Sequence, residues 1–250
     1  MKKGDKVIVI LVSLILIVSV VVGFMTRQSY YDDTDFNKAT ENIDSFNVEL
    51  EPISLFPEDP FLSALGEQYG QEDINSFSEL QDKSDLIVKV IPTDDRKVLF
   101  ARTILSRVKV LDVYKGKDIT AGDNLYIYEP CNIQFGKAEL YDSYDGYIFM
   151  HKAREYVLFL KKLNVPEGYR YRGKEKISYV LTSMAFGKYP VQAYGHTEVI
   201  DEDRVNPYIA DKTIKFAEIK DMDLIAIRME TLKKYNEIKE QLIAQDMIEP

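Results

Sequence analysis

The sequence predicts a mainly β, α+β protein: a small antiparallel β-barrel with a short N-terminal helix and a long C-terminal helix, preceded by one transmembrane helix. Three observations support this prediction. An apolar run opens the chain, short β-branched segments follow one another from residue 85, and the closing stretch repeats apolar residues every three or four positions. Successive strands without interleaved helices favour an antiparallel barrel or sandwich over a parallel α/β sheet.

Residues 1–25 are expected to form an N-terminal signal-anchor. The run 7–25 is 19 residues long and holds only three small or polar residues, and ~20 apolar residues at ~1.5 Å each match a hydrocarbon core of ~30 Å. Lysines precede the run and aspartates follow it, so we expect a single-pass membrane protein with a cytoplasmic N-terminus and an extracellular C-terminal domain. A cleaved signal peptide is the alternative, which the absence of an A-x-A type cleavage site disfavours.

The part of the chain beyond residue 25 is acidic, with 29 basic and 40 acidic residues. This charge disfavours nucleic acid as a partner, because such binding depends on Lys and Arg side chains that neutralise phosphates. It also disfavours adhesion to anionic lipid headgroups beyond the anchor itself. The single cysteine, Cys131, excludes an intrachain disulfide and a Cys-x-x-Cys redox pair. No motif predicts a cofactor.

Residues 26–74 are expected to form an acidic tether that is partly disordered. Residues 32–82 hold 14 acidic residues and one basic residue, whereas residues 83–250 hold 26 acidic and 27 basic residues. The acidic stretch also carries three prolines and few clustered apolar residues, a composition too poor in hydrophobic clusters to fold independently. The extracytoplasmic domain is therefore predicted to span residues 75–250.

A short helix is predicted at the start of this domain. Asn75 or Ser76 can cap it, and Glu79 completes a capping box. Phe77 and Leu80 are then expected to point inward.

The next apolar segments predict a β-hairpin. "DLIVKVIP" (85–92) ends at a proline, "TDDR" (93–96) supplies turn residues, and "KVLFARTILSRVKVLDVY" (97–114) forms the second strand. In this second strand the alternation of apolar and charged residues slips by one position at Leu111. Such a slip predicts a β-bulge, which a curved sheet requires.

Further strands and a terminal helix complete the predicted domain. Strand-like segments recur at 124–133, 147–152, 155–163, 177–186 and 190–200. The closing stretch predicts a helix over residues 221–246 with Asp221 as its N-cap. Its apolar stripe is formed by Ile225, Met229, Leu232, Tyr235, Ile238 and Leu242. We expect this stripe to pack on the sheet, and a docking face for a partner is the alternative.

Four stretches of the chain resemble a known module: "SDLIVKV" (84–90), "VKVLDVYKGK" (108–117), "LYIYEPCNI" (125–133) and "EYVLFLKKL" (155–163). They are similar to the OB-type barrel of netrin-like and tissue-inhibitor-of-metalloproteinase modules, and to uncharacterised extracytoplasmic proteins of Gram-positive bacteria. The resemblance implies an OB-like barrel. It does not imply protease inhibition, because the Cys-x-Cys that such inhibitors present to zinc is absent here. OB-type barrels bind oligonucleotides or oligosaccharides, but a fold does not define a function.

Cys131 and His151 are the one pair that could supply a thiol nucleophile and its base. A membrane-anchored β-barrel with this pair invites comparison with sortases, but the cysteine precedes the histidine and the Thr-Leu-x-Thr motif is missing. A single cysteine in an apolar strand is usually a small core residue. Catalysis requires the thiol and the base to meet in space.

Two acidic loops are weak candidates for calcium binding, since calcium prefers six to eight oxygen ligands. The first loop offers Glu139, Asp142 and Asp145, and the second offers His196, Glu198, Asp201, Glu202 and Asp203. Their spacing matches no EF-hand, and clustered acidic residues more often form a solvated loop. Two histidines in the whole chain make a zinc site of three protein ligands improbable without carboxylates.

Tyrosines are the remaining candidates for a binding surface. The chain has 17 of them and no tryptophan, and the tyrosines around one loop are Tyr126, Tyr128, Tyr141, Tyr144 and Tyr147. Their amphipathic rings suit sugar stacking or protein contact. The alternative is that they fill half-buried strand positions, for which tyrosine has a high propensity.

These observations predict a non-catalytic, membrane-tethered extracytoplasmic module that binds a protein or polysaccharide of the cell envelope. Residues 7–25 would contact the membrane. The alternatives are a cell-surface cysteine-dependent enzyme, sortase-like or another hydrolase, that uses Cys131 and His151, and a structural assembly protein that acts through its C-terminal helix.

Overall fold

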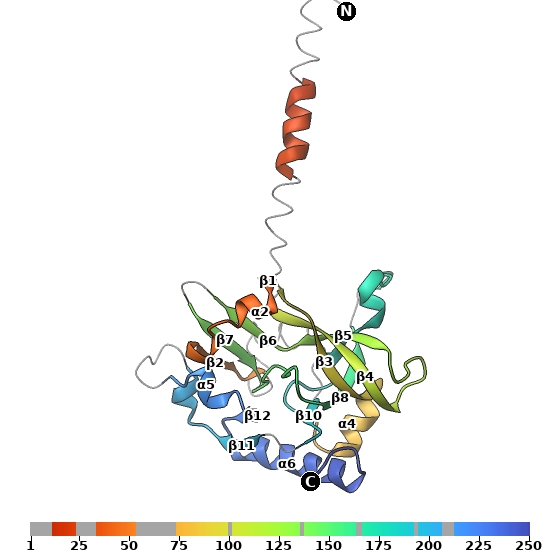
Figure 1. Ribbon diagram of the computed structural model, residues 1–250, viewed down its shortest axis with the longest axis vertical. Coiled ribbons are helices and arrows are strands. Elements are labelled where there is room, and N and C mark those ends of the chain that lie inside the picture. Colours follow the sequence, from red (N-terminus) through yellow and green to blue (C-terminus); the bar gives the residue numbers. More distant parts are fainter. Residues whose placement is uncertain are drawn as a thin grey trace, which may run out of the picture.

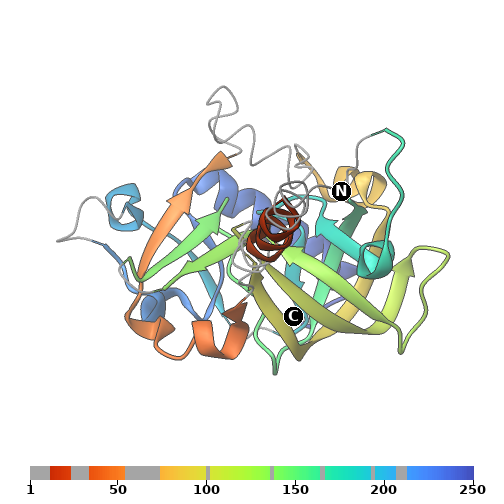
Figure 2. The same ribbon diagram turned by 90° about the horizontal axis from the view of Figure 1, so that it is seen from above.

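The computed structural model describes residues 12–23, 34–53, 74–99, 102–135, 138–163, 167–192, 195–206 and 213–250. It shows an α+β protein with a mixed seven-stranded sheet and helices near both ends of the chain. Figure 1 shows the helix of residues 12–23 apart from a folded body, with α6 (Met229–Ala244) along the opposite side of that body. Figure 2 views the body from above, nearly along the axis of the N-terminal helix.

Residues 12–23 are helical, and their large apolar side chains are exposed. The other residues of the expected transmembrane run 7–25 lie outside the described ranges. Among the helices of the described residues, none combines the length and the apolar character that crossing a membrane demands.

The large sheet is curved, since a strand near the far end of the strand order pairs back with its longest strand. β3 (Leu86–Leu99) pairs with β4 (Thr103–Lys115) and also with β8 (Tyr156–Lys162). The strand order is β1-β3-β4-β5-β9-β8-β10. The remaining members are β1 (Thr34–Asp35), β5 (Asn124–Glu129), β9 (Ser178–Leu181) and β10 (Lys188–Pro190).

The predicted α+β class is confirmed, but the prediction of a small antiparallel barrel is wrong. The sheet is mixed, since β5 and β9 are parallel while the other pairs are antiparallel, and it is not a closed barrel. The sequence did not show this, because parallel pairing joins segments that lie about 50 residues apart in the chain and a parallel pair needs a long crossover connection.

The predicted hairpin forms, but its turn is displaced. Residues 93–96 were expected to reverse the chain and instead continue β3, with an irregular register between Pro92 and Arg96. Thr93 Oγ1 donates a hydrogen bond to the carbonyl of Arg107 at 3.0 Å, which keeps the polar segment against β4. The predicted bulge is confirmed: Lys89 pairs with Asp112 and Val90 with Val110, so Leu111 is the extra residue.

Residues 34–53 belong to the folded body and are not part of a tether. They form β1, α2 (Phe36–Ala39), η1 (Ile43–Ser45) and β2 (Asn47–Glu51). Phe36, Phe46 and Val48 are buried in the main core. The average composition of this acidic stretch did not predict their burial. A few well-spaced apolar residues are enough to fix a segment in place when they pack against a core that other segments form. The remaining residues of the expected tether, 26–33 and 54–73, lie outside the described ranges.

A second, three-stranded sheet lies beside the curved sheet (Figure 1). β7 (Leu140–Tyr144) is its central strand, parallel to β2 and antiparallel to β6 (Cys131–Gln134). One face of this sheet contributes Val48, Ile133 and Tyr141 to the main core. The opposite face carries the polar residues described below.

The predicted short helix is confirmed as α4 (Phe77–Lys83). Ser76 is its N-cap, and its Oγ accepts a hydrogen bond from the amide of Glu79 at 3.2 Å. The Glu79 carboxylate in turn accepts from the amide of Asn75 at 2.9 Å. Phe77 and Leu80 are buried, as the spacing predicted.

The predicted C-terminal helix of residues 221–246 is too long at its start. Met222–Ala226 form strand β12, which pairs in parallel with β11 (His196–Val199), and α6 begins at Met229. The segment "DLIAI" is rich in β-branched and apolar residues, and all of β12 is buried. Pairing with β11 thus makes this segment a strand, although its apolar residues are also spaced as in a helix. Short helical turns precede β9, follow β11 and precede β12: η3 (Gly173–Ile177), η4 (Glu202–Val205) and α5 (Phe216–Ile219).

Candidate functional site

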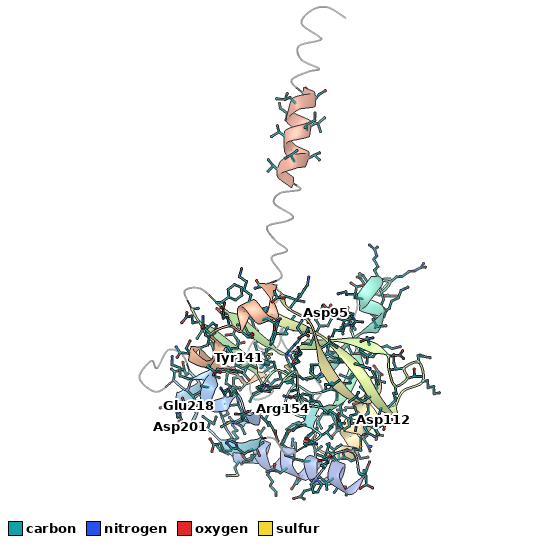
Figure 3. All side chains as sticks on the ribbon, viewed as in Figure 1. Asp95, Asp112, Tyr141, Arg154, Asp201 and Glu218 are labelled. Carbon is teal, nitrogen blue, oxygen red and sulfur yellow. The ribbon has the colours of Figure 1, made fainter. Side chains whose placement is uncertain are left out.

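The predicted tyrosine surface is largely part of the core. Tyr126, Tyr141, Tyr144 and Tyr147 are buried, while Tyr128 is half-buried. Figure 3 labels Tyr141 within the body. Its hydroxyl donates to the carbonyl of Tyr147 at 2.9 Å and accepts from the amide of Phe149 at 3.1 Å. Because the rings of Tyr126, Tyr141, Tyr144 and Tyr147 are buried, they are not placed to stack on a sugar.

Cys131 and His151 lie in different environments. Burial, followed by the nearby Glu129 charge, raises the pKa of the Cys131 thiol well above its usual value. Burial lowers the pKa of His151 to about 4, and its Nε2 donates to the carbonyl of Lys220 at 2.6 Å. A buried thiol that stays protonated is a poor nucleophile, and the histidine nitrogen is engaged by the backbone.

The acidic loops are not arranged as a calcium site. Asp142 is buried and accepts hydrogen bonds from Asn132 Nδ2 and Gln134 Nε2 at 2.9 and 2.8 Å. Asp201 caps η4 by accepting from the amide of Asp203 at 3.0 Å. Across the described ranges no group of three or more His, Cys, Asp or Glu residues is placed to hold a metal ion.

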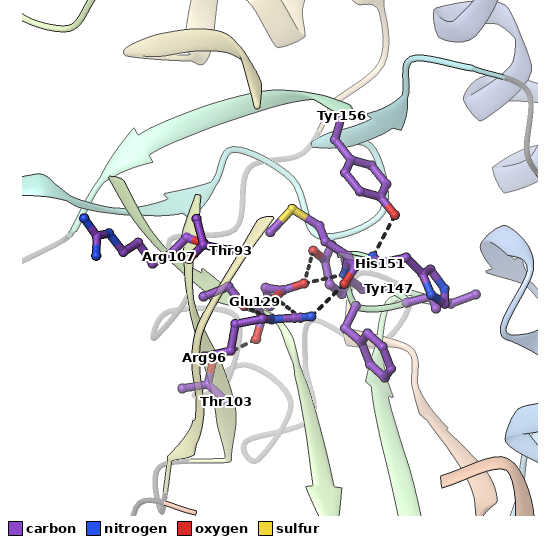
Figure 4. Close-up of polar contacts among 12 residues, drawn as sticks. Thr93, Arg96, Thr103, Arg107, Glu129, Tyr147, His151 and Tyr156 are labelled. Carbon is purple, nitrogen blue, oxygen red and sulfur yellow. Dashed lines mark hydrogen bonds and ion pairs between the residues drawn. The ribbon is translucent and has the colours of Figure 1, made fainter. Parts of the chain in front are cut away.

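Figure 4 shows a buried polar network that the sequence analysis missed. Glu129 of β5 is fully buried, and its carboxylate accepts from Arg96 Nη2 at 2.6 Å, from the Tyr147 hydroxyl at 2.8 Å and from the amide of Met150 at 2.7 Å. Ser106 Oγ also donates to it. The guanidinium carbon of Arg96 lies 3.8 Å from the centre of the Phe36 ring.

Lys188 lies beside this network. Its ammonium group donates to the carbonyl of Ile148 and lies 4.5 Å from the centre of the Tyr147 ring. Burial lowers the pKa of Lys188 to about 8. Because Arg96, Glu129 and Lys188 are all buried and hydrogen-bonded within the protein, we interpret the network as structural support for the junction of the two sheets.

The face of the three-stranded sheet that is opposite the main core gathers charged side chains. Glu49 of β2 is the register partner of Asp142, and Asp142 is the register partner of Asn132, so the three side chains share one face. Glu51 follows two residues after Glu49 and lies on the same face. We call the set Glu49, Glu51, Arg102, Asn132, Gln134 and Asp142 the acidic face.

Arg102 reaches the acidic face from the β3–β4 connection. Its Nη2 lies 3.4 Å from Asp142 Oδ2 and 3.6 Å from Glu51 Oε1. Arg102 has a positive φ of 57°, which a residue with a Cβ adopts at a cost in backbone strain. The Arg102 guanidinium thus lies near two carboxylates, those of Asp142 and Glu51, and the face is negatively charged when these and Glu49 are ionised.

Glu51 has the most distinctive carboxyl group on this face. Its side chain is 12% exposed, and its Oε2 atom is buried with no hydrogen-bond partner among the residues that the structure describes. Burial raises its pKa to about 7, and Asp142 and Glu49 add to this effect while Arg102 opposes it. Burial and Asp142 also raise the pKa of Glu49.

The raised pKa of Glu51 and its buried Oε2 atom, unpaired within the described ranges, make the acidic face the candidate functional site. Carboxyl groups that titrate near neutral pH are enriched at functional sites, and a buried oxygen without a donor offers a place for a ligand N–H or O–H group. The signal in the sequence was "NVELE" (47–51), in which charged and apolar residues alternate as in a half-buried strand. Comparison with protein-family models, with curated proteins and with solved structures finds no match for this chain.

Proposed function

We propose that this protein is a non-catalytic binding module of the cell envelope, tethered to the membrane with its N-terminus in the cytoplasm and its C-terminal domain outside. The helix of residues 12–23 supports the tether, because its apolar side chains are more than half exposed in the structure, from 51% for Val21 to 64% for Val20. Such a surface is stable in hydrocarbon and costly in water. The flanking charges support the orientation.

We propose the acidic face as the binding site, on the evidence of Glu51. A buried carboxylate oxygen with no donor favours a ligand that supplies one, and a cationic donor is favoured further by the surrounding carboxylates. Envelope proteins with exposed Lys or Arg residues and polysaccharides with amino or hydroxyl groups have this chemistry. The three-stranded sheet would hold the face rigid, since all three of its strands also contribute side chains to the main core.

We also propose that the curved sheet is related to OB-type barrels. The pairing of β3 with β4 and β8, and of β9 with β5 and β8, supports a five-stranded Greek-key arrangement of that type. The resemblance to netrin-like modules rests on the same strands. A cysteine-based enzyme has less support, because the Cys131 thiol is buried and its pKa is raised.

A binding experiment tests the proposed site. Full-length protein in detergent micelles is immobilised and exposed to envelope extract at pH 8, with Glu51→Gln as the test variant and Glu237→Gln, on the exposed side of α6, as the control. We expect Glu51→Gln to bind the captured component about tenfold more weakly, the loss of roughly one charge-assisted hydrogen bond. Glu237→Gln is expected to bind like the wild type. Equal binding by all three proteins would exclude the acidic face.

A further inference from the structure

A basic projection stands out on this acidic protein. Residues 167–177, which include η3, contain Arg170, Arg172, Lys174 and Lys176 against two acidic residues, Glu167 and Glu175. Figure 1 shows the segment rising from the body on the side that carries β1 and the N-terminal helix, and Figure 2 shows it facing the viewer from that side. We call residues 167–177 the basic projection.

The shape of the projection is held by its own acidic residue. Both carboxylate oxygens of Glu175 lie 2.7 Å from the Tyr169 hydroxyl, and Oε2 also accepts from the amide of Arg172 at 2.7 Å. The Tyr171 hydroxyl donates to the carbonyl of Leu163 at 2.7 Å and ties the projection to the end of β8. Glu175 is thus engaged inside the projection, and Lys174 Nζ lies 4.3 Å from the centre of the Tyr126 ring, while Arg170, Arg172 and Lys176 are exposed.

The exposed side chains of the projection combine positive charge with apolar surface. Arg170, Arg172 and Lys176 are exposed, and within the described residues none of them forms an ion pair. Tyr169 and Ile177 are also exposed, at 44% and 37%. Basic residues together with Tyr and aliphatic residues are the composition that binds the headgroup region of an anionic bilayer.

The chain length places this side of the body near the membrane. Ten residues separate the helix end at residue 23 from Thr34, the first residue of β1, and ten residues span at most ~35 Å. If the helix of residues 12–23 is embedded as proposed above, the β1 side cannot move far from the bilayer surface. The basic projection lies on that side (Figure 1).

We propose that the basic projection contacts the anionic phospholipid headgroups of the membrane in which the N-terminal helix is anchored. The contact holds the folded body against the surface in one orientation, with α6 directed away from it. This inference rests on the proposed membrane tether. It also refines the expectation from net charge: overall acidity disfavours adhesion to anionic lipid, but headgroups respond to charge within about a Debye length, ~10 Å.

Site-specific fluorescence in vesicles tests this proposal. Full-length protein is reconstituted into phosphatidylcholine vesicles with or without phosphatidylglycerol, with a quencher attached to the lipid headgroups. A fluorophore is placed at Glu167→Cys in the projection, at Glu237→Cys on α6, or at Val18→Cys in the N-terminal helix. Cys131 is buried and does not take up the label.

We expect the label at residue 167 to be quenched in vesicles that contain phosphatidylglycerol and at least about tenfold less in the Arg170→Glu/Arg172→Glu variant, because reversed charges are repelled by the headgroups. The label at residue 237 should not respond to either change. Quenching at residue 167 that ignores phosphatidylglycerol and charge reversal, with residue 18 still quenched, would overturn the projection contact alone.

Two further outcomes would also overturn the inference. An unquenched label at residue 18 would remove the membrane tether on which it rests. A response at residue 167 to soluble poly(glycerol phosphate), with none to phosphatidylglycerol, would identify an anionic polymer as the partner in place of the lipid surface.

Discussion

Two arginines of this protein form ion pairs that differ in burial, and we expect them to contribute different amounts to the free energy of unfolding. Arg96 and Glu129 are 4% and 0% exposed and form an ion pair of 2.6 Å with further hydrogen bonds. Arg107, one strand away, is 40% exposed and lies 3.9 Å from Asp95. Both are arginines in the same hairpin, so they form a matched pair for measurement.

Arg96→Met is expected to lower the free energy of unfolding by about 3–5 kcal/mol, because it leaves the buried Glu129 carboxylate without its counter-charge. Arg107→Met is expected to change it by less than ~1 kcal/mol, as for most exposed ion pairs. Denaturant unfolding of both variants measures the difference. Equal costs for the two substitutions would refute a structural role for the buried network.

Glu51 makes stability depend on pH. Its pKa rises from an ordinary value of 4.5 to about 7 on folding, so the unfolded chain releases this proton at lower pH than the folded protein does. The contribution of Glu51 to stability is therefore present below pH ~4.5 and is lost as the pH rises toward ~7.

Glu51→Gln should remove this loss, since the amide has the shape of the protonated carboxyl group and does not ionise. We expect the variant and the wild type to melt together at pH 4, and the variant to melt about 2–4 °C higher at pH 8, the shift for ~1 kcal/mol in a chain of this size. Thermal unfolding across this range measures it. A difference in melting temperature between Glu51→Gln and the wild type that is the same at pH 4 and pH 8 would contradict the raised pKa of Glu51.

At the scale of elements, close backbone contacts decide where strands meet. Gly146 follows β7 with a φ of +82°, and a Cβ there would lie 1.9 Å from the carbonyl oxygen of Ile225 in β12. Its own carbonyl accepts a hydrogen bond from the Ile225 amide at 2.9 Å. Gly122 has a similar φ of +98° with nothing within 4 Å of a Cβ.

Gly146→Ala is therefore expected to cost more than ~4 kcal/mol or to prevent folding, because it combines strain with a backbone clash. Gly122→Ala is expected to cost about 1 kcal/mol through its φ alone. Soluble yield and thermal unfolding of the two variants make the comparison. A Gly146→Ala protein as stable as Gly122→Ala would show that β7 and β12 do not pack as described.

The helix α6 separates residues that the sequence grouped in one stripe. Tyr235 is buried and stacks on Tyr189 with ring centres 4.7 Å apart, whereas Met229 is 63% exposed. We expect Tyr235→Ala to cost about 3–5 kcal/mol and Met229→Ala less than ~0.5 kcal/mol. Denaturant unfolding distinguishes them. A large effect of Met229→Ala would instead support the packed apolar stripe predicted from the sequence, in which Met229 is buried.

At the scale of the whole molecule, the apolar N-terminal helix favours a hydrocarbon environment and the acidic body favours water. Leu16 is 61% exposed in the structure, and under the proposed tether it lies near the middle of the bilayer. Leu16→Arg is expected to cost ~2.5–3.5 kcal/mol of insertion free energy, which is roughly 100-fold. Leu16→Ile is the control.

Fractionation of cells into membrane and soluble material measures this effect. We expect Leu16→Arg to shift the protein toward the soluble fraction, while the wild type and Leu16→Ile stay with the membrane after washing with high salt. A wild-type protein released by salt alone would contradict a transmembrane tether.

The sequence by itself determined the features that depend on neighbours in the chain. The capped helix α4, the hairpin of β3 and β4, the bulge at Leu111 and the exposed apolar helix of residues 12–23 all follow from local spacing, because caps, pleats and bulges involve residues a few positions apart. Tertiary structure alone decided the parallel pairs β2–β7, β5–β9 and β11–β12. It also decided which tyrosines are buried and where Glu51, Arg102 and Asp142 meet, because burial and charge contact depend on segments that are distant in the chain and come together only when the sheets form.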